Sequence, residues 1–114
     1  MAAKKSGALN FQGDVGLIRV DSVEVNPKYR IRNIEKDAQN RFVLARGEAT
    51  GHTHAMDAAH VNLIAESGGL VLEVTEATEL VHQEHDPILI APGRYIPVQQ
   101  HEFDWLEGLR AVRD

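Results

Sequence analysis

The sequence contains no cysteine and only three serines, at positions 6, 22 and 67. The absence of cysteine excludes disulfide bonds, thiolate metal sites and cysteine nucleophiles, and it fits the reducing cytoplasm. None of the serines lies in a nucleophile-elbow sequence, and the chain has no glycine-rich phosphate loop or dinucleotide-binding motif. A metal ion, if one is bound, would therefore be held by imidazole and carboxylate groups.

Long apolar runs are also missing. No segment approaches the roughly 20 consecutive apolar residues of a membrane-spanning helix. Two lysines stand near the start of the chain, but the apolar run that would follow them in a secretory signal is absent. We therefore expect a cytoplasmic protein with a flexible N-terminal tail over residues 1–12 and a single β domain over residues 13–114.

Acidic side chains outnumber basic ones. The chain has 17 Asp and Glu but only 12 Lys and Arg, which gives a formal net charge of −5. Such a chain is repelled by nucleic acids and by anionic membranes. One short segment departs from this balance, since Lys28, Arg30 and Arg32 surround a tyrosine. The segment is interpreted either as a solvent-facing strand or turn, or as a phosphate contact of a nucleic-acid-associated module.

What the chain does contain is a series of short segments rich in branched apolar residues and bounded by turn formers. These predict strands over residues 13–20, 23–25, 41–46, 61–66, 70–75, 78–82, 88–90 and 94–101. The turn Ser67-Gly68-Gly69 indicates a hairpin, and Pro97 indicates an edge strand or a bulge. The predicted fold class is all-β, a compact antiparallel sandwich or jelly-roll-like barrel, with a short C-terminal helix over residues 102–114 as an option.

The strand that begins at Arg41 is predicted to run on as far as Met56. Alternation along it would place small residues on one face, including Ala45, Gly47 and Ala49, and bulky or polar residues on the other. A face of small residues lets another backbone approach closely. We therefore expect this face to pack against neighbouring copies in a homo-oligomer.

Four of the six histidines lie in two short segments, His52-Thr53-His54 and His82-Gln83-Glu84-His85. On an extended backbone the first pair leaves the same face roughly 6.6 Å apart, whereas on a helix the two rings would point about 200° apart. A shared ion site therefore requires a strand. The second pair can join it only if the chain bends, which the following Asp86-Pro87 favours.

The candidate metal ligands are His52, His54, His82 and His85, with Asp57 or Glu84 as alternative oxygen ligands. Such ligands suit a divalent transition metal, namely zinc, iron, manganese or nickel. Three protein ligands would leave one coordination position of the metal open, as in catalytic sites, whereas four would make a structural site. The alternative is that no ion binds and that the histidines form hydrogen bonds in turns or at an interface. We expect ordinary structural roles for His60 and His101, which stand apart.

Two family resemblances arise at these residues. His52-Thr53-His54, followed by Ala91-Pro92-Gly93 in a β-rich chain, resembles the cupin pattern, which implies a metal inside a jelly roll. The glutamate of that pattern is missing, since Ala58 and Ala59 stand at its place, and no histidine follows the Pro-Gly turn at the cupin distance.

The chain is more similar to a set of small, uncharacterised bacterial and phage-associated proteins. The shared motifs are Gln-Gly-Asp-Val, Gly-His-x-His, His-x-Glu-His-x-Pro-Ile and a Pro-Gly turn before a tyrosine, which begin here at Gln12, Gly51, His82 and Pro92. This resemblance implies a single small β domain and supplies no established activity.

Three functions remain open from the sequence. The favoured one is a self-assembling structural or binding unit, in which the clustered histidines lie at an interface or an ion site. The first alternative is a cupin-like metal-dependent enzyme, and the second is the nucleic-acid-associated module. No complete catalytic set can be named, so the balance lies against an enzyme.

Overall fold

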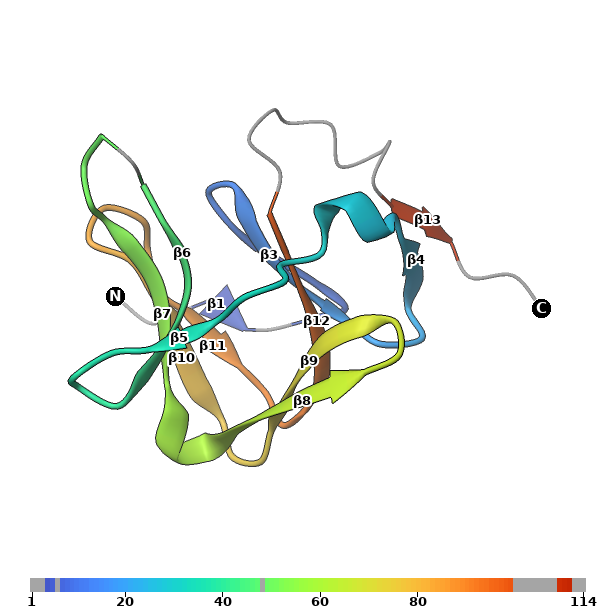
Figure 1. The fold of residues 1–114 in the computed structure, drawn as a ribbon. Helices are drawn as coiled ribbons and strands as arrows, with labels where there is room; N and C mark the ends of the chain where they lie inside the picture. Colours follow the sequence, from blue (N-terminus) through green and yellow to red (C-terminus); the bar gives the residue numbers. More distant parts are fainter. Residues whose placement is uncertain (1–3, 6, 48, 100–108, 112–114) are drawn as a thin grey trace.

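The computed structural model describes residues 4–5, 7–47, 49–99 and 109–111 (Figure 1). Its larger sheet, sheet A, has six strands in the order β1-β11-β10-β7-β6-β5. Their bounds are Lys4–Lys5 for β1, Glu35–Lys36 for β5, Arg41–Arg46 for β6, Thr53–Asp57 for β7, Thr78–Val81 for β10 and Ile88–Ile90 for β11. Neighbouring strands are antiparallel except β1 and β11, which run parallel.

The second sheet, sheet B, has five antiparallel strands in the order β2-β3-β12-β9-β8. Their bounds are Leu9–Gln12 for β2, Val15–Arg19 for β3, Val61–Glu66 for β8, Gly69–Val74 for β9 and Gly93–Gln99 for β12. A separate pair joins β4, Val23–Val25, to β13, Leu109–Ala111. Two short 3-10 turns, Pro27–Tyr29 and Ala58–His60, complete the described elements.

The apolar side chains between the sheets form one core. Sheet A contributes Phe42, Leu44, Met56, Leu80, Ile88 and Ile90, and sheet B contributes Val15, Leu17, Val61, Leu72, Val74 and Tyr95. Alternation along each strand sends every second side chain inward, which is why Ile88 and Ile90 are buried while Leu89 between them is exposed. The buried Tyr95 hydroxyl donates to the Ala91 carbonyl at 2.7 Å, so its polar end is satisfied.

The structure confirms the predicted all-β class and the antiparallel sandwich, and the hairpin at Ser67-Gly68-Gly69 joins β8 to β9. Two boundaries differ. Lys4–Lys5 and Leu9–Gln12 were expected in the tail but form β1 and β2, because they pair with β11 and β3, respectively. Leu109–Ala111, within the optional C-terminal helix, form a strand paired with β4, and the rest of residues 102–114 lies outside the described residues.

The long strand predicted from Arg41 to Met56 is wrong, because the chain folds back on itself within it. β6 and β7 pair as an antiparallel hairpin with an irregular register between Val43 and Ala45. Gly51, at a φ of 72°, helps the turn to close, and the Gly47 amide donates to the His52 carbonyl at 2.8 Å. The small residues therefore do not form one continuous face, which removes that argument for assembly.

Pro97 lies in β12, which is an inner strand of sheet B rather than the expected edge. The proline is tolerated because β12 pairs with β9 only through Gly93, Arg94 and Tyr95. Beyond that point its open side meets an irregular segment, and the Pro97 carbonyl accepts a hydrogen bond from the Ile31 amide at 3.0 Å. Among the described residues, no helix has the length and apolar character needed to cross a membrane.

Candidate functional site

The two histidine segments meet because their strands are neighbours in sheet A. β7 and β10 pair in a register that opposes Met56 to Leu80 and Ala55 to Val81. The next step along this antiparallel register brings His54 beside His82. The Thr53 amide donates to the Gln83 side chain at 2.8 Å and extends the contact past the last ladder pair.

The chain bends directly after β10, as the second histidine pair requires. Nδ1 of His82 accepts hydrogen bonds from the Glu84 amide at 3.0 Å and from the His85 amide at 3.3 Å. These bonds curl the backbone around the imidazole. The bend turns His85 back toward His54, near the start of β7.

The four imidazoles consequently form one group. The ring centroid of His82 lies 4.4 Å from that of His54, 4.7 Å from that of His85 and 5.5 Å from that of His52. The rings of His54 and His85 are nearly parallel, with centroids 6.0 Å apart. The structure thus brings together all four histidines that the sequence singled out.

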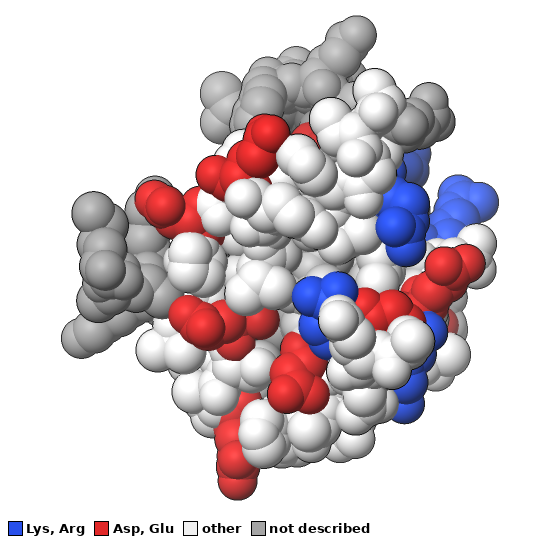
Figure 2. Space-filling model, turned by 90° about the vertical axis from the view of Figure 1, so that its left-hand side faces the viewer, with Lys and Arg blue, Asp and Glu red and all other residues white. Residues whose placement is uncertain are grey.

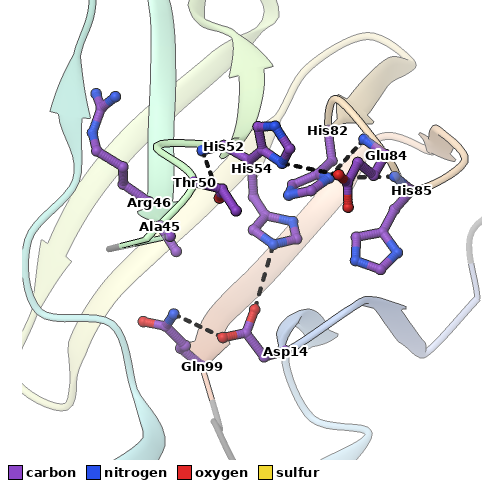
Figure 3. Close-up of a pocket in the computed structure, with 11 residues that line it drawn as sticks. Asp14, Ala45, Arg46, Thr50, His52, His54, His82, Glu84, His85 and Gln99 are labelled. Carbon is purple, nitrogen blue, oxygen red and sulfur yellow. Dashed lines mark hydrogen bonds and ion pairs between the residues drawn. The ribbon is translucent and has the colours of Figure 1, made fainter.

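These imidazoles line an open cleft of about 630 Å³ together with Asp14 and Glu84 (Figure 3). We call this space the histidine cleft. Arg46, Thr50 and Gln99 lie at its margin, and the guanidinium of Arg46 points away from the imidazoles. Charged and hydrogen-bonding groups dominate the lining, so the cleft suits an ion or a small polar molecule better than an apolar one.

A third segment, which consists of the end of β2 and the turn between β2 and β3, completes the site and was missed from the sequence. Gln12 is buried, with 3% of its surface exposed, and its side-chain nitrogen donates to the carbonyls of Leu80 at 2.9 Å and Asp86 at 3.0 Å. Its side-chain oxygen lies 2.9 Å from Nδ1 of His54. Gln12 therefore links sheet B to both ends of the second histidine segment.

Asp14 follows in the same turn. Its Oδ1 lies 3.4 Å from Nε2 of His54, and its Oδ2 accepts a hydrogen bond from Gln99 at 3.1 Å. The sequence carried a signal for this residue, since the Gln-Gly-Asp-Val motif includes it. The signal gave no spatial information, because 40 residues of sequence separate Asp14 from His54.

Burial changes the acid–base behaviour of two imidazoles. Desolvation and the charge of neighbouring His82 lower the pKa of His54 to about 4, although Asp14 acts in the opposite direction. Desolvation and the charges of His85 and His52 also lower the pKa of His82. His54 is consequently uncharged at neutral pH, which is the state in which imidazole binds metals.

The remaining predicted residues lie in several places. Glu84 lines the cleft, with Oε1 3.6 Å from Nδ1 of His52. Asp57 does not line it, and instead accepts a hydrogen bond from the Ala59 amide at 2.9 Å. His60 lies 3.2 Å from Glu76, as suits a surface pair, and His101 is outside the described residues. Within the described ranges, no three His, Asp or Glu side chains are already arranged to hold a metal ion.

The basic segment at Lys28, Arg30 and Arg32 is divided by the fold. The Arg30 guanidinium donates to the Leu70 carbonyl at 3.0 Å and packs on Gly69, whereas Lys28 and Arg32 are exposed. On the face shown in Figure 2, acidic side chains are spread widely and basic ones gather toward one side. This distribution gives no support to a nucleic-acid surface on that face.

A comparison with curated proteins finds no match, and neither does one with solved structures. A family model does match, over residues 11–100, and its description is a domain of unknown function, DUF8820. The matched range contains Gln12, Asp14 and all four histidines of the cleft. This agrees with the expected resemblance to a small uncharacterised family. The chain belongs to the DUF8820 family.

Proposed function

We propose that this protein binds a divalent transition-metal ion in the histidine cleft. The observation that carries the proposal is the convergence of four imidazoles from two segments, whose neighbouring ring centroids lie 4.4 to 6.0 Å apart, around an open space that is also lined by two carboxylates. Imidazole and carboxylate are the ligands that zinc, iron, manganese and nickel share.

The protonation state of the cluster supports this proposal. Burial is the main cause of the lowered pKa values of His54 and His82, and the repulsion between charged imidazoles this close adds to it. The uncharged rings present lone pairs to the cleft or to their neighbours. A cation that accepts these lone pairs binds without first displacing protons from the buried ring.

The volume of the cleft, about 630 Å³, is far larger than one ion requires. A small molecule therefore has room to approach a bound ion from the open side. For this reason a cupin-like metal-dependent enzyme remains the alternative, with the ion at the same place.

Assembly into a homo-oligomer is a second proposal, favoured by a different observation. β8 forms one edge of sheet B, and Leu9 in the opposite edge strand, β2, is 44% exposed. An open strand edge and an exposed leucine are features that a second copy of the chain can cover. The histidine cleft is separate from β8, so the two proposals do not exclude each other.

Native mass spectrometry of the untagged protein tests both proposals, before and after treatment with a chelator. We expect one metal ion per chain, removed by the chelator and absent in the His54→Ala variant. The matched control is His60→Ala, which removes an imidazole outside the cleft and should leave the ion bound. Far-UV circular dichroism of both variants establishes that the fold is retained.

Titration of the metal-free protein with zinc, iron(II), manganese(II) and nickel(II) supplies the affinity. A dissociation constant on the order of 1 μM or tighter for at least one of them is expected. If the wild-type protein binds none of the four, or if His60→Ala weakens binding as much as His54→Ala, the metal proposal fails. A single chain mass at all concentrations would count against the homo-oligomer.

A further inference from the structure

The tautomer of His54 is fixed by its neighbour Gln12. Both amide hydrogens of Gln12 are used by carbonyls, those of Leu80 and Asp86, so its nitrogen and oxygen cannot be exchanged without losing two hydrogen bonds. Its oxygen must therefore face Nδ1 of His54, at 2.9 Å. An oxygen acceptor at this distance requires a proton on Nδ1.

With the proton on Nδ1, the uncharged ring presents a lone pair at Nε2. That lone pair faces Oδ1 of Asp14 across 3.4 Å, and the carboxylate oxygen is also an acceptor. Two acceptors that face each other inside a protein repel, because neither supplies a hydrogen. A cation between them turns this repulsion into attraction to both atoms.

The separation of the two atoms suits a shared ion. Ligand bonds of about 2.0 to 2.1 Å at a tetrahedral angle place two donor atoms roughly 3.4 Å apart. The distance between Nε2 of His54 and Oδ1 of Asp14 is 3.4 Å. The second oxygen of Asp14 is held by Gln99 at 3.1 Å, which orients the carboxylate toward the imidazole.

His82 is occupied in a different way. Its Nδ1 accepts two backbone hydrogen bonds from the bend, so in the uncharged ring the proton stands on Nε2. A ring with one nitrogen capped by backbone amides and the other protonated has no lone pair for an ion. The His82 side chain instead stabilises the bend that places His85 at the cleft.

His85 is the imidazole placed beside Asp14. A methyl group added to Gly13 would lie 2.7 Å from Nε2 of His85, so the ring packs directly against the residue that precedes Asp14. His85 is exposed and its ring centroid lies 6.0 Å from that of His54, so a change of side-chain rotamer is the movement by which a ring nitrogen would reach an ion held by Asp14 and His54.

We infer that a two-histidine, one-carboxylate set formed by His54, Asp14 and His85 holds the ion, an assignment that rests on the proposed function. Gln12 is its positioning residue, and His82 is not a ligand. Such a set leaves coordination positions open toward the cleft, and it is used for zinc and for non-haem iron(II). It replaces Asp57 and Glu84 by Asp14 as the oxygen ligand.

Three variants test the assignment by zinc titration of metal-free protein. Asp14→Asn keeps the shape of the side chain but removes its charge, and we expect it to weaken zinc binding roughly 100-fold or more; His85→Ala should weaken it at least about tenfold. His82→Asn is the matched control. An asparagine oxygen can accept the same amide hydrogen bonds, so zinc affinity should stay within about threefold of wild type.

Two-dimensional NMR of the imidazole nitrogens in wild-type, metal-free protein reports the tautomers without any substitution. We expect the proton on Nδ1 in His54 and on Nε2 in His82, and we expect the Nε2 resonance of His54 to shift when zinc is added. The reverse tautomers, or a doubly protonated His54 at pH 7, would overturn the assignment.

The experiments distinguish a failure of the proposed metal-binding function from a failure of the ligand assignment. If wild-type protein binds no metal, the proposed function fails. If wild-type protein binds zinc but His82→Asn abolishes binding while Asp14→Asn or His85→Ala leaves it unchanged, the function stands and the ligand assignment is overturned.

Discussion

The lowered pKa of His54 makes the stability of the metal-free protein depend on pH in a calculable way. The ordinary pKa of about 6.5 applies in the unfolded chain and a value of about 4 in the folded one. Between these values the unfolded chain binds a proton that the folded chain does not. The contribution of His54 to the free energy of unfolding is therefore fully present above pH 6.5 and is lost as pH falls toward 4.

The size of the loss follows from the two pKa values. Between pH 7 and pH 5, proton binding by the unfolded imidazole stabilises the unfolded chain by about 2 kcal/mol relative to the folded one. For a domain of this size that corresponds to a decrease in the melting temperature of roughly 8 °C. Most carboxylates remain ionised at pH 5, so this window isolates the histidine contribution from general acid denaturation.

Urea unfolding at pH 7 and pH 5, in the presence of a chelator, measures the effect. The variant His54→Gln keeps a side chain that hydrogen-bonds to Gln12 but cannot titrate, so its loss of stability over this window should be smaller than that of wild type by about 2 kcal/mol. His60→Ala, with its imidazole removed from a surface pair, should keep the full loss. An equal loss in wild type and His54→Gln would refute the reasoning.

Four further predictions concern the cleft and the core. Zinc at about 100 times its dissociation constant should raise the free energy of unfolding by about 2.7 kcal/mol, seen as a chelator-reversible increase in melting temperature. Gly13→Ala should lower stability by about 1 kcal/mol, because Gly13 has a φ of 59°, and should weaken zinc binding by displacing His85; unchanged zinc affinity would contradict this packing. Gln12→Leu leaves two carbonyls and a ring nitrogen unsatisfied, so urea unfolding should show a loss of about 2 to 4 kcal/mol. Ile90→Ala, in the core and not among the residues that line the cleft, should cost about 2 to 5 kcal/mol in the same assay yet leave zinc affinity unchanged.

Sequence reasoning succeeded where the information is local. The period-2 alternation of apolar residues and the glycine turn at Gly68-Gly69 depend on neighbours in the chain, so strands such as β8 and β9 could be predicted. It failed where a turn interrupts a regular pattern. The segment from Gly47 to Gly51 keeps the alternation of a strand, but its glycines allow a fold-back that the pairing of β6 with β7 stabilises.

The candidate site was predicted only in part, because some of its features are local in the sequence and others are not. Histidine pairs at short spacing are visible in a sequence, and the register of β7 with β10 brings them together. Gln12 and Asp14 belong to the Gln-Gly-Asp-Val motif, but nothing in that local sequence indicates which distant residues they contact. Only the packing of the β2–β3 turn of sheet B against the end of sheet A shows that they face His54.

The proposed ligands lie on different sheets, and this placement has a thermodynamic consequence. Asp14 belongs to the turn of sheet B, whereas His54 and His85 belong to sheet A and the loop after it, so their convergence requires that the sheets be packed together. Gln12 reinforces the same junction through its hydrogen bonds to Leu80 and Asp86. An ion bound there contacts a set of groups that the unfolded chain does not hold together. Metal binding should therefore stabilise the sandwich as a whole and not the histidine loop alone.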